Sequence, residues 1–385
     1  MTNEEFKDWR WQERNSLRSA SNIRKFFPKF PENEIMQIAE YEKKRRWGIT
    51  PYTISLMTID SEGNPSSQDP IVRQTFPIRG FKLDTAIDSY DNKKQPNWEL
   101  QSEMPTPILQ HKYTKKVILR VPNACLGYCG YCFEVERTED KESKKGSING
   151  LLWQKSMQYI RYNPIISEVI LSGGDPLLMD NSSIESKIVD IRNIPSVRAI
   201  RIHTRTLTFN PFRIDDELVN ILKKYKVTEL GLHISHSDEL TSNVAEALQK
   251  FNECGYGNIL KMGQTPLIKG VNDDSHILEE LFMRMYSDFQ IKPYYLYHGL
   301  PWSPASLQYR TSVKKGVILM NSLKRHIPSV ALPEYAIVHH NGKHTVPLEE
   351  NGTPEFQYTQ DDARNPIVRF KNWKGNWETY LDGRD

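Results

Sequence analysis

The sequence predicts an α/β protein built on a partial (β/α)6 barrel of parallel strands, and three observations support this fold class. Six short apolar runs rich in β-branched residues recur from about residue 115 onward. A segment with helical periodicity follows each run, as expected of successive βαβ units. The runs are nearly continuous in apolar residues, which is typical of strands that are covered on both faces. Six units in succession suggest an open or partial barrel rather than a closed eight-fold one.

The predicted elements divide the chain into three parts. The strands are expected at residues 116–121, 167–173, 198–204, 227–234, 258–265 and 292–298. The helices between and after them are expected at roughly 150–162, 183–192, 215–225, 238–253, 275–287 and 311–325. We therefore predict a barrel over residues 111–348, preceded by a wrapping extension over 1–110 with helical pieces near 3–28 and 32–47. Residues 349–385 are expected to form a short C-terminal tail.

Composition restricts the class of protein further. The chain has 385 residues, of which 38% are hydrophobic and 26% charged, and its formal net charge is +3. That balance favours no polyanionic partner, so we expect no nucleic-acid binding. The N-terminal residues are acidic and Trp-rich where a signal peptide has an apolar core, and no stretch approaches the roughly 18 apolar residues of a membrane span. We expect a cytoplasmic protein without a membrane partner.

Three of the four cysteines form a C-x3-C-x2-C cluster, Cys125, Cys129 and Cys132. Four cysteines are too few for a disulfide framework in a chain this long, so the cluster indicates metal binding or catalysis. Structural zinc sites use four ligands, and no second Cys/His pair with that spacing stands out. Three thiolates instead suit a four-iron cluster with one iron open to a small chelating molecule. A zinc site or coincidental clustering is the alternative. Cys254 is expected to be a buried apolar filler near a helix end.

Polar residues follow each predicted strand at its carboxyl end, where ligands gather in parallel α/β folds. Polar groups from six strands are therefore expected to face one cavity. They are the cysteine cluster, Gly173, Gly174, Asp175, Thr204, Arg205, His233, His236, Gln264 and His298.

The cysteine motif, with Tyr131 before and Phe133 after its last cysteine, resembles that of the radical S-adenosylmethionine superfamily, as does LSGGDPLL at 171–178. The resemblance implies a [4Fe-4S] cluster whose open iron is chelated by S-adenosylmethionine. It also implies that the backbone at Gly173, Gly174 and Asp175 contacts this cofactor. Arg205, His233 and Gln264 are then expected on the cofactor side of the cavity, although each could be an ordinary polar residue at a strand end.

The resemblance extends to the lysine 2,3-aminomutase family over about residues 8–380. The blocks that carry it are DWRWQERN, ITPYTISL, HKYTKKVIL, RIHTRTLTFNPFRI, LHISHSDELT, GQTPLIKGVND, KPYYLYH and NGKHTVP. This family implies a second cofactor, pyridoxal 5′-phosphate, attached to Lys343 and seated by Lys112, Tyr113 and Lys116. Without the resemblance, Lys343 would be interpreted as an exposed lysine after a glycine. The family's glycine run before this lysine is shortened here to residues 339–342, HHNG.

The implied activity is migration of an amino group from C2 to C3 of an amino acid. Its implied partners are an amino acid substrate and a flavodoxin- or ferredoxin-like electron donor, with homo-oligomerisation possible. The alternatives are radical chemistry without migration, isomerisation of a lysine on a protein, and, from another class, a non-catalytic iron–sulfur or zinc-binding protein.

The chain departs from the family pattern at three places. Glu134 replaces an arginine that pairs with the substrate carboxylate in lysine-acting members, and Arg137 could fill that gap. Asp273 matches one acid that reads the distal ammonium of lysine, but residues 336–339 lack its partner. Residues 350–385 contain no cysteine, so no family-type zinc site is expected, and an oligomer could use Trp9, Trp11, Trp373 and Trp377. Residues 134–145 are expected to be a solvated loop or helix end, with a lid over the cluster as the alternative.

Overall fold

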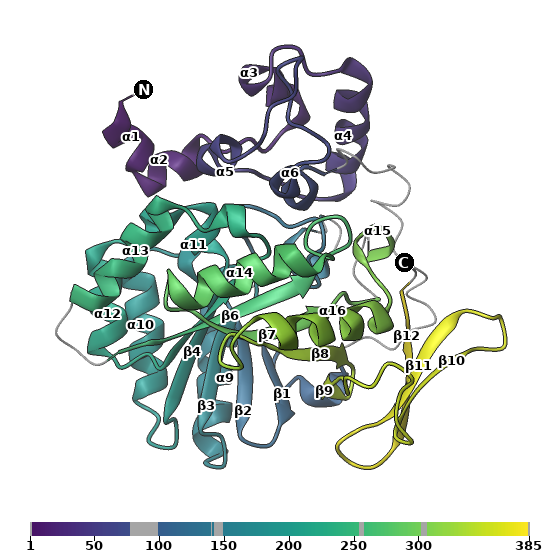
Figure 1. Ribbon diagram of the computed structural model, residues 1–385. Helices are drawn as coiled ribbons and strands as arrows, with labels where there is room; N and C mark the ends of the chain where they lie inside the picture. Colours follow the sequence, from purple (N-terminus) through teal and green to yellow (C-terminus); the bar gives the residue numbers. More distant parts are fainter. Residues whose placement is uncertain are drawn as a thin grey trace.

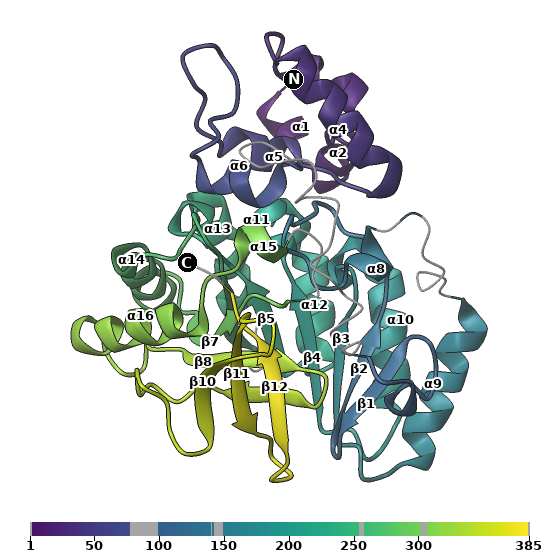
Figure 2. The same cartoon turned by 90° about the vertical axis from the view of Figure 1, so that its right-hand side faces the viewer.

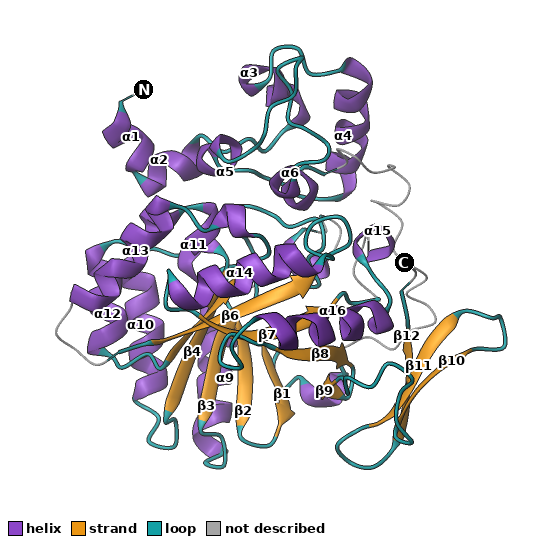
Figure 3. Ribbon diagram, in the orientation of Figure 1, coloured by secondary structure: helices purple, strands orange, loops and turns teal. Residues whose placement is uncertain are grey.

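The barrel is a single sheet of nine strands that follow one another in chain order (Figures 1 and 3). The computed structural model describes residues 2–77, 99–139, 141, 149–253, 258–301 and 306–383. Cys254 lies outside the described residues, as do residue 140 and residues 142–145 of the charged run. Strands β2 to β8 are parallel, while β1 and β9 pair antiparallel at the two edges, so the described sheet is an open barrel.

The six predicted strands are confirmed, with ends displaced by at most two residues. The nine strands are β1 (Leu109–Tyr113), β2 (Lys116–Arg120), β3 (Glu168–Ser172), β4 (Ala199–Thr204), β5 (Glu229–His233), β6 (Leu260–Leu267), β7 (Lys292–His298), β8 (Glu334–His339) and β9 (Gly342–Thr345). The sequence did not reveal β8 as a seventh parallel strand. It runs directly into β9, which has no apolar pattern and pairs back on it through a turn at residues 340–341.

Amphipathic helices connect the parallel strands and cover the sheet, as Figure 1 shows. They are α9 (Gly150–Tyr162), α10 (Asn181–Arg192), α12 (Asp216–Lys224), α13 (Ser242–Glu253), α14 (Ser275–Ser287) and α16 (Val313–His326). Their starts are encoded locally, because Asn149, Asp180, Asp215, Asp274 and Ser312 each accept a hydrogen bond from a first-turn N–H. Their apolar faces and the strands form the main hydrophobic core.

Short helical turns follow the strands and shape their carboxyl ends. They are α8 (Val135–Thr138), α11 (Thr206–Phe209), α15 (Ser306–Tyr309), η4 (Pro176–Leu178), η5 (Pro211–Arg213) and η6 (Ser237–Glu239), whereas η2 (Gln101–Glu103) precedes β1. They hold the strand-end loops in fixed conformations, which allows the side chains there to form a defined site.

An N-terminal layer of short helices lies over one end of the barrel (Figures 1 and 2). It comprises α1 (Asn3–Lys7), α2 (Trp9–Arg14), η1 (Ala20–Asn22), α3 (Ile23–Phe26), α4 (Glu32–Lys44), α5 (Pro51–Ser55) and α6 (Pro70–Thr75). It has its own aromatic-rich core, which includes Phe30 and Phe76 stacked with centroids 5.5 Å apart. Its backbone meets the cysteine loop, since the N–H of Gly130 donates to the carbonyl of Gln74 at 2.8 Å.

The predicted C-terminal tail forms a second sheet, which is antiparallel and three-stranded. It contains β10 (Phe356–Gln360), β11 (Pro366–Lys371) and β12 (Trp377–Leu381) (Figure 2). Tyr380 of β12 is fully buried, and its hydroxyl lies 2.8 Å from Nδ1 of His298. This contact fastens the small sheet to the end of β7.

Two expectations about surfaces can be compared with the structure. Trp9 is buried, and the guanidinium carbon of Arg213 lies 4.6 Å from its ring centroid, so Trp9 does not present a surface to another subunit. Trp373 and Trp377 are exposed. In the described part of the chain, no helix is long and apolar enough to cross a membrane.

Candidate active site

One cavity of about 370 Å³ is lined by residues from the cysteine loop and from strands β1 to β9. It brings together nearly all the predicted site residues. These are Lys112, Tyr113, Lys116, Cys125, Cys129, Cys132, Glu134, Gly173, Gly174, Asp175, Arg205, His233, Gln264 and Lys343. Residues that follow different parallel strands line the same cavity, because the chain leaves each of these strands at the same end of the barrel.

The three cysteines lie on the loop after β2, are partly accessible and are not joined in a disulfide. A turn in which the N–H of Cys132 donates to the carbonyl of Cys129 at 3.0 Å holds the last two together. Burial raises the pKa of each thiol, and for Cys125 the next contribution is the charge of Cys132. Three soft donors that repel one another as thiolates fit an iron–sulfur cluster. Bound iron would offset both the cost of burying the thiolates and their mutual repulsion.

Gly173 and Gly174 are required by the close approach of the cysteine loop. Gly173 has φ +115°, and a Cβ on Gly174 would lie 2.2 Å from the carbonyl oxygen of Ala124. The N–H of Gly174 donates to Pro122 at 2.7 Å, and the N–H of Asp175 donates to Ala124 at 2.9 Å. The glycine pair thus seats the loop that carries Cys125 directly on the end of β3.

Asp175 links the ends of two strands. Its carboxylate accepts hydrogen bonds from Thr204 Oγ1 at 2.7 Å and from the N–H groups of Arg205 and Thr206 at 2.7 and 2.8 Å. The carboxylate of Asp175, whose backbone is expected to contact S-adenosylmethionine, therefore bonds within the protein and fixes the start of α11 after β4.

Arg205 is buried at the junction of several segments. Its guanidinium donates to Gln74 Oε1 at 2.7 Å, to Ser235 Oγ at 3.0 Å and to Glu239 Oε2 at 3.1 Å, and it also contacts the Tyr131 hydroxyl. Neighbouring negative groups, Cys129 and Glu239, hold its pKa above the usual value. Arg205 is consequently a permanent positive charge beside the cysteine loop.

His233 and Gln264 line the cavity from β5 and β6. Burial lowers the pKa of His233 to about 4, so its imidazole is neutral at physiological pH. The side-chain amide nitrogen of Gln264 lies 3.2 Å from Nε2 of His203, a cavity residue that the sequence analysis missed. In β4, Arg201 and His203 are partly buried polar residues that alternate with fully buried ones. This alternation could have revealed His203 as a cavity residue.

The other two predicted histidines contribute less. His298 lines the cavity, but its ring nitrogens are both used, one with the Tyr380 hydroxyl and one with the carbonyl of Thr311, each at 2.8 Å. His236 caps the η6 turn and is not part of the cavity lining. Both act as structural residues at their strand ends.

Lys343 reaches the cavity from β9, the antiparallel edge strand. Its Nζ lies 3.2 Å from the centroid of the Tyr295 ring, and its backbone N–H donates to the Tyr113 hydroxyl at 2.7 Å. Burial lowers the pKa of Lys343 to about 8, and the positive charges of Lys116 and Arg201 add to this. A partly buried amine of lowered pKa on an aromatic surface fits a lysine that attaches a carbonyl cofactor.

The other two predicted coenzyme residues flank Lys343. Lys112 pairs with Glu103 at 2.6 Å and also donates to the backbone carbonyl of His340. Lys116 lies over the Tyr113 ring at 4.6 Å. Together they place two cations beside the β8–β9 turn, which is a suitable charge for a phosphate. Tyr294 and Tyr297, which the sequence analysis did not assign, complete this aromatic wall.

Glu134 and Arg137, the two residues considered for the substrate carboxylate, both interact with other residues of the protein. Glu134 is buried, and its carboxylate accepts from Nε of Arg120 at 2.8 Å. Arg137 does not extend into the cavity, because it holds Glu99 through two hydrogen bonds of 2.9 Å. These residues form one buried charge network, and paired buried charges are costly to separate.

The first part of residues 134–145 is buried rather than solvated. Residues 135–138 form α8, and Val135, Thr138 and Glu139 are buried beside the cysteines. Asp273 likewise does not have its predicted place. It pairs with Lys315 at 2.5 Å, accepts from the N–H of Gly270 at 2.6 Å and is not part of the cavity lining.

A thiol-lined cavity at the carboxyl ends of an open parallel barrel defines the class of protein as a radical S-adenosylmethionine enzyme. Residues 119–281 match the family model described as the Radical SAM superfamily. That class implies a [4Fe-4S] cluster and S-adenosylmethionine as cofactors.

Similarity over nearly the whole chain narrows the class to one family. The chain is 30% identical to the L-lysine 2,3-aminomutase of Clostridium subterminale over 98% of this chain and 85% of that protein. It is 30% identical to the enzyme of the same name from Fusobacterium nucleatum, over 99% and 84% of the two chains. It is 28% identical to the glutamate 2,3-aminomutase of Clostridioides difficile, over 97% and 82%. The chain belongs to the lysine 2,3-aminomutase family of radical S-adenosylmethionine enzymes.

Proposed function

We propose that this protein is a pyridoxal phosphate-dependent aminomutase that moves the amino group of a free amino acid from C2 to C3. The observation that supports this most directly is that the three cysteines and a lysine of lowered pKa line the same cavity. Neither feature alone distinguishes an aminomutase from other radical enzymes or from other coenzyme-binding proteins. Their combination in one cavity is what the reaction needs, because the two cofactors must meet the same substrate.

The cysteine end of the cavity would generate the radical. Cys125, Cys129 and Cys132 would hold the cluster, which when bound supplies an electron that cleaves S-adenosylmethionine to a carbon radical able to remove a hydrogen from the substrate. The backbone at Gly173 and Gly174 holds the cysteine loop in place. The N-terminal layer contacts the same loop and helps to exclude water from the chemistry.

The Lys343 end would hold the coenzyme. With a pKa of about 8, roughly one tenth of Lys343 is neutral and nucleophilic at pH 7. Tyr113 fixes its backbone, Tyr295 lies against its ammonium, and Lys112 and Lys116 would bind the phosphate. When bound, pyridoxal phosphate supplies a conjugated ring that can carry the substrate nitrogen during its migration.

The arrangement of acids favours a substrate without a distal ammonium group. Three acids line the described cavity, and Glu134 and Asp175 are both committed to partners in the protein. The third, Glu139, accepts from the Tyr41 hydroxyl at 3.4 Å and lies beside Cys132. Asp273 is paired elsewhere with Lys315. We therefore infer that the substrate is an amino acid other than lysine.

The proposal is tested by incubating anaerobically reconstituted enzyme with S-adenosylmethionine, a reductant and separate amino acids, including lysine, glutamate and neutral ones. Mass spectrometry should detect deoxyadenosine together with a 3-amino isomer of one non-lysine substrate. Borohydride should trap the coenzyme on Lys343, and Lys343→Ala should lose the coenzyme absorbance but keep its iron, while the exposed control Lys371→Ala keeps both.

Other outcomes separate the alternatives. Deoxyadenosine without an isomer indicates radical chemistry without migration. An isomer formed only when a protein lysine is supplied indicates protein modification. Iron without any bound coenzyme rejects the aminomutase proposal, and zinc in place of iron rejects the radical enzyme.

A further inference from the structure

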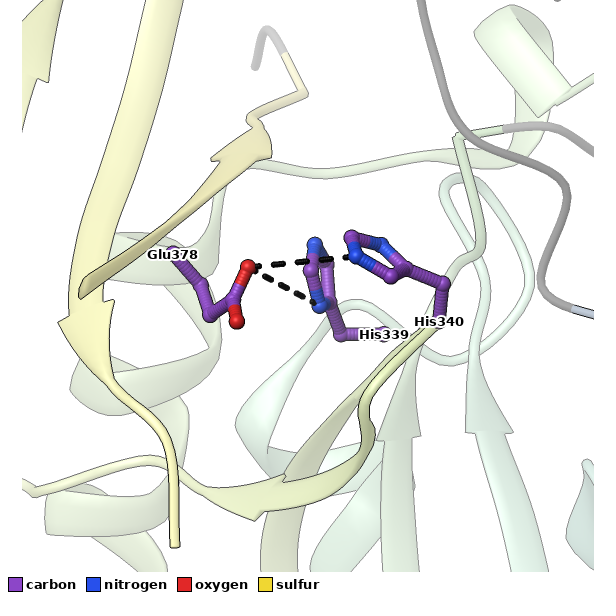
Figure 4. A group of neighbouring side chains, drawn as sticks. All are labelled: His339, His340 and Glu378. Atoms are coloured by element: carbon purple, nitrogen blue, oxygen red, sulfur yellow. Dashed lines mark ion pairs between the residues drawn. The ribbon is translucent and has the colours of Figure 1, made fainter. Parts of the chain in front are cut away.

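Two histidines and a glutamate converge at the edge of the cavity, whose lining includes His339, between the barrel and the C-terminal sheet (Figure 4). His339 ends β8, His340 follows it in the turn, and Glu378 comes from β12. One potential ligand atom from each lies within 4.8 Å of the other two. Glu378 Oε2 is 4.0 Å from Nδ1 of His339 and 3.9 Å from Nε2 of His340. His339 is 1% exposed, and the other two side chains are partly buried.

Neighbouring groups orient this cluster. Glu378 Oε1 accepts from the side-chain amide of Asn372 at 2.7 Å and from that of Asn341, which leaves Oε2 directed at the imidazoles (Figure 4). The Asn341 amide nitrogen also lies 3.1 Å from Nε2 of His340, a bridge that a cation would replace. Nδ1 of His340 is buried without a hydrogen-bond partner among the described residues. Buried polar groups in such a position usually indicate a missing partner or a reoriented side chain.

We propose that His339, His340 and Glu378 bind one divalent first-row metal ion, with Zn²⁺ as the preferred occupant and water at the fourth position. Two imidazoles and a carboxylate are a donor set that suits zinc. Tetrahedral bonds of about 2.0–2.1 Å place ligand atoms roughly 3.4 Å apart. The two distances from Glu378 therefore need to shorten by about 0.5–0.6 Å, and the distance between the two histidine nitrogens, which is at most 4.8 Å, by up to about 1.4 Å. The amide of Asn372 acts as the outer partner that holds the carboxylate in its binding orientation.

The ion would fasten the coenzyme hairpin to the C-terminal sheet. His340 precedes Lys343 by one turn of the β8–β9 hairpin, and its carbonyl accepts from Lys112. A metal bridge to β12 would therefore fix the β8–β9 hairpin, and with it Lys343, to the C-terminal sheet. The lack of cysteine in residues 350–385 predicts no family-type zinc site, but these ligands are of another kind and come from two separate segments. This inference is independent of the reaction proposed above.

The test uses full-length enzyme carrying its iron–sulfur cluster, equilibrated with buffered Zn²⁺ and then desalted. Elemental analysis should give one zinc per chain. Zinc K-edge X-ray absorption, which does not detect the iron, should show nitrogen and oxygen ligands at about 2.0–2.1 Å. His340→Ala and the isosteric Glu378→Gln should lose this zinc while retaining iron content and circular dichroism. Glu355→Gln, an exposed control on the same small sheet, should retain it.

Three results would overturn the proposal. They are the absence of zinc from the wild-type protein, a sulfur shell near 2.3 Å that places zinc at the cluster cysteines, and equal zinc in Glu378→Gln and wild type. The first two are measured on the wild-type chain, so they decide the question even if a variant fails to fold.

Discussion

At the scale of single residues, Lys343 shows how the fold converts an ordinary side chain into a reactive one. A lysine after a glycine in a turn is exposed and fully charged by default. Here it lies against Tyr295, and desolvation together with nearby cations lowers its pKa to about 8. Because the neutral amine is the nucleophile, this shift raises the reactive fraction at pH 7 from about one in three thousand to about one in ten.

We predict that the rate at which pyridoxal phosphate attaches to coenzyme-free enzyme rises with pH up to about 8 and then levels off. The sign follows from the lowered pKa of Lys343, since the neutral amine becomes the major form only as the pH passes that value. Stopped-flow absorbance of the bound coenzyme measures the rate. Continued increase to pH 10 would mean that Lys343 keeps an ordinary lysine pKa.

At the scale of elements, the end of β3 determines where the cysteine loop lies. The backbone of Gly173 and Gly174 is in contact with residues 120–124, and two hydrogen bonds join the segments. Asp175 continues this contact to the end of β4. The motif is therefore a structural joint between three strand ends as well as a candidate cofactor surface.

We predict that Gly174→Ala prevents proper seating of the cysteine loop, because its Cβ would lie 2.2 Å from a backbone oxygen. The expected cost is about 1–3 kcal/mol in unfolding free energy, with a marked loss of iron after reconstitution. Denaturant unfolding and iron content measure the two effects. Gly150→Ala is the matched control, since its Cβ meets nothing within 4 Å at the start of α9. Equal iron content in Gly174→Ala and Gly150→Ala would show that the close contact at Gly174 does not seat the cysteine loop.

At the scale of the whole molecule, one buried arginine connects layers that are far apart in the sequence. Arg205, at the end of β4, bonds to Gln74 of the N-terminal layer and to Ser235 and Glu239 after β5. The N-terminal layer is thus fixed over the cysteine loop by polar contacts as well as by its own apolar core.

We predict that Arg205→Ala destabilises the protein by about 3–5 kcal/mol, because it leaves Glu239 buried without its cation. Lys7→Ala removes an exposed ion pair with Glu246 and should lower the unfolding free energy by less than about 1 kcal/mol. Urea unfolding compares the two variants. A loss below about 1 kcal/mol for Arg205→Ala would show that the layers are held together by other contacts.

Prediction from sequence succeeded where the signal is local. The apolar runs of β2 to β7 and the capping residues of the helices are readable one segment at a time, and the cysteine spacing identified the cluster loop directly. It failed where a residue's role depends on a distant partner. Glu134 is an example, because no local pattern predicts that its carboxylate is buried against Arg120, fourteen residues earlier.

The sequence alone determined the parallel barrel, the position of the cysteine loop and membership of the family. These follow from hydrophobic periodicity and motif spacing, which are properties of neighbouring residues. Only the tertiary structure decided which charges are free. It paired Glu134, Arg137 and Asp273 within the protein, lowered the pKa of Lys343, and brought His339, His340 and Glu378 together. Electrostatic interactions and burial depend on distance in space, and distance in space is set by the packing of the whole chain.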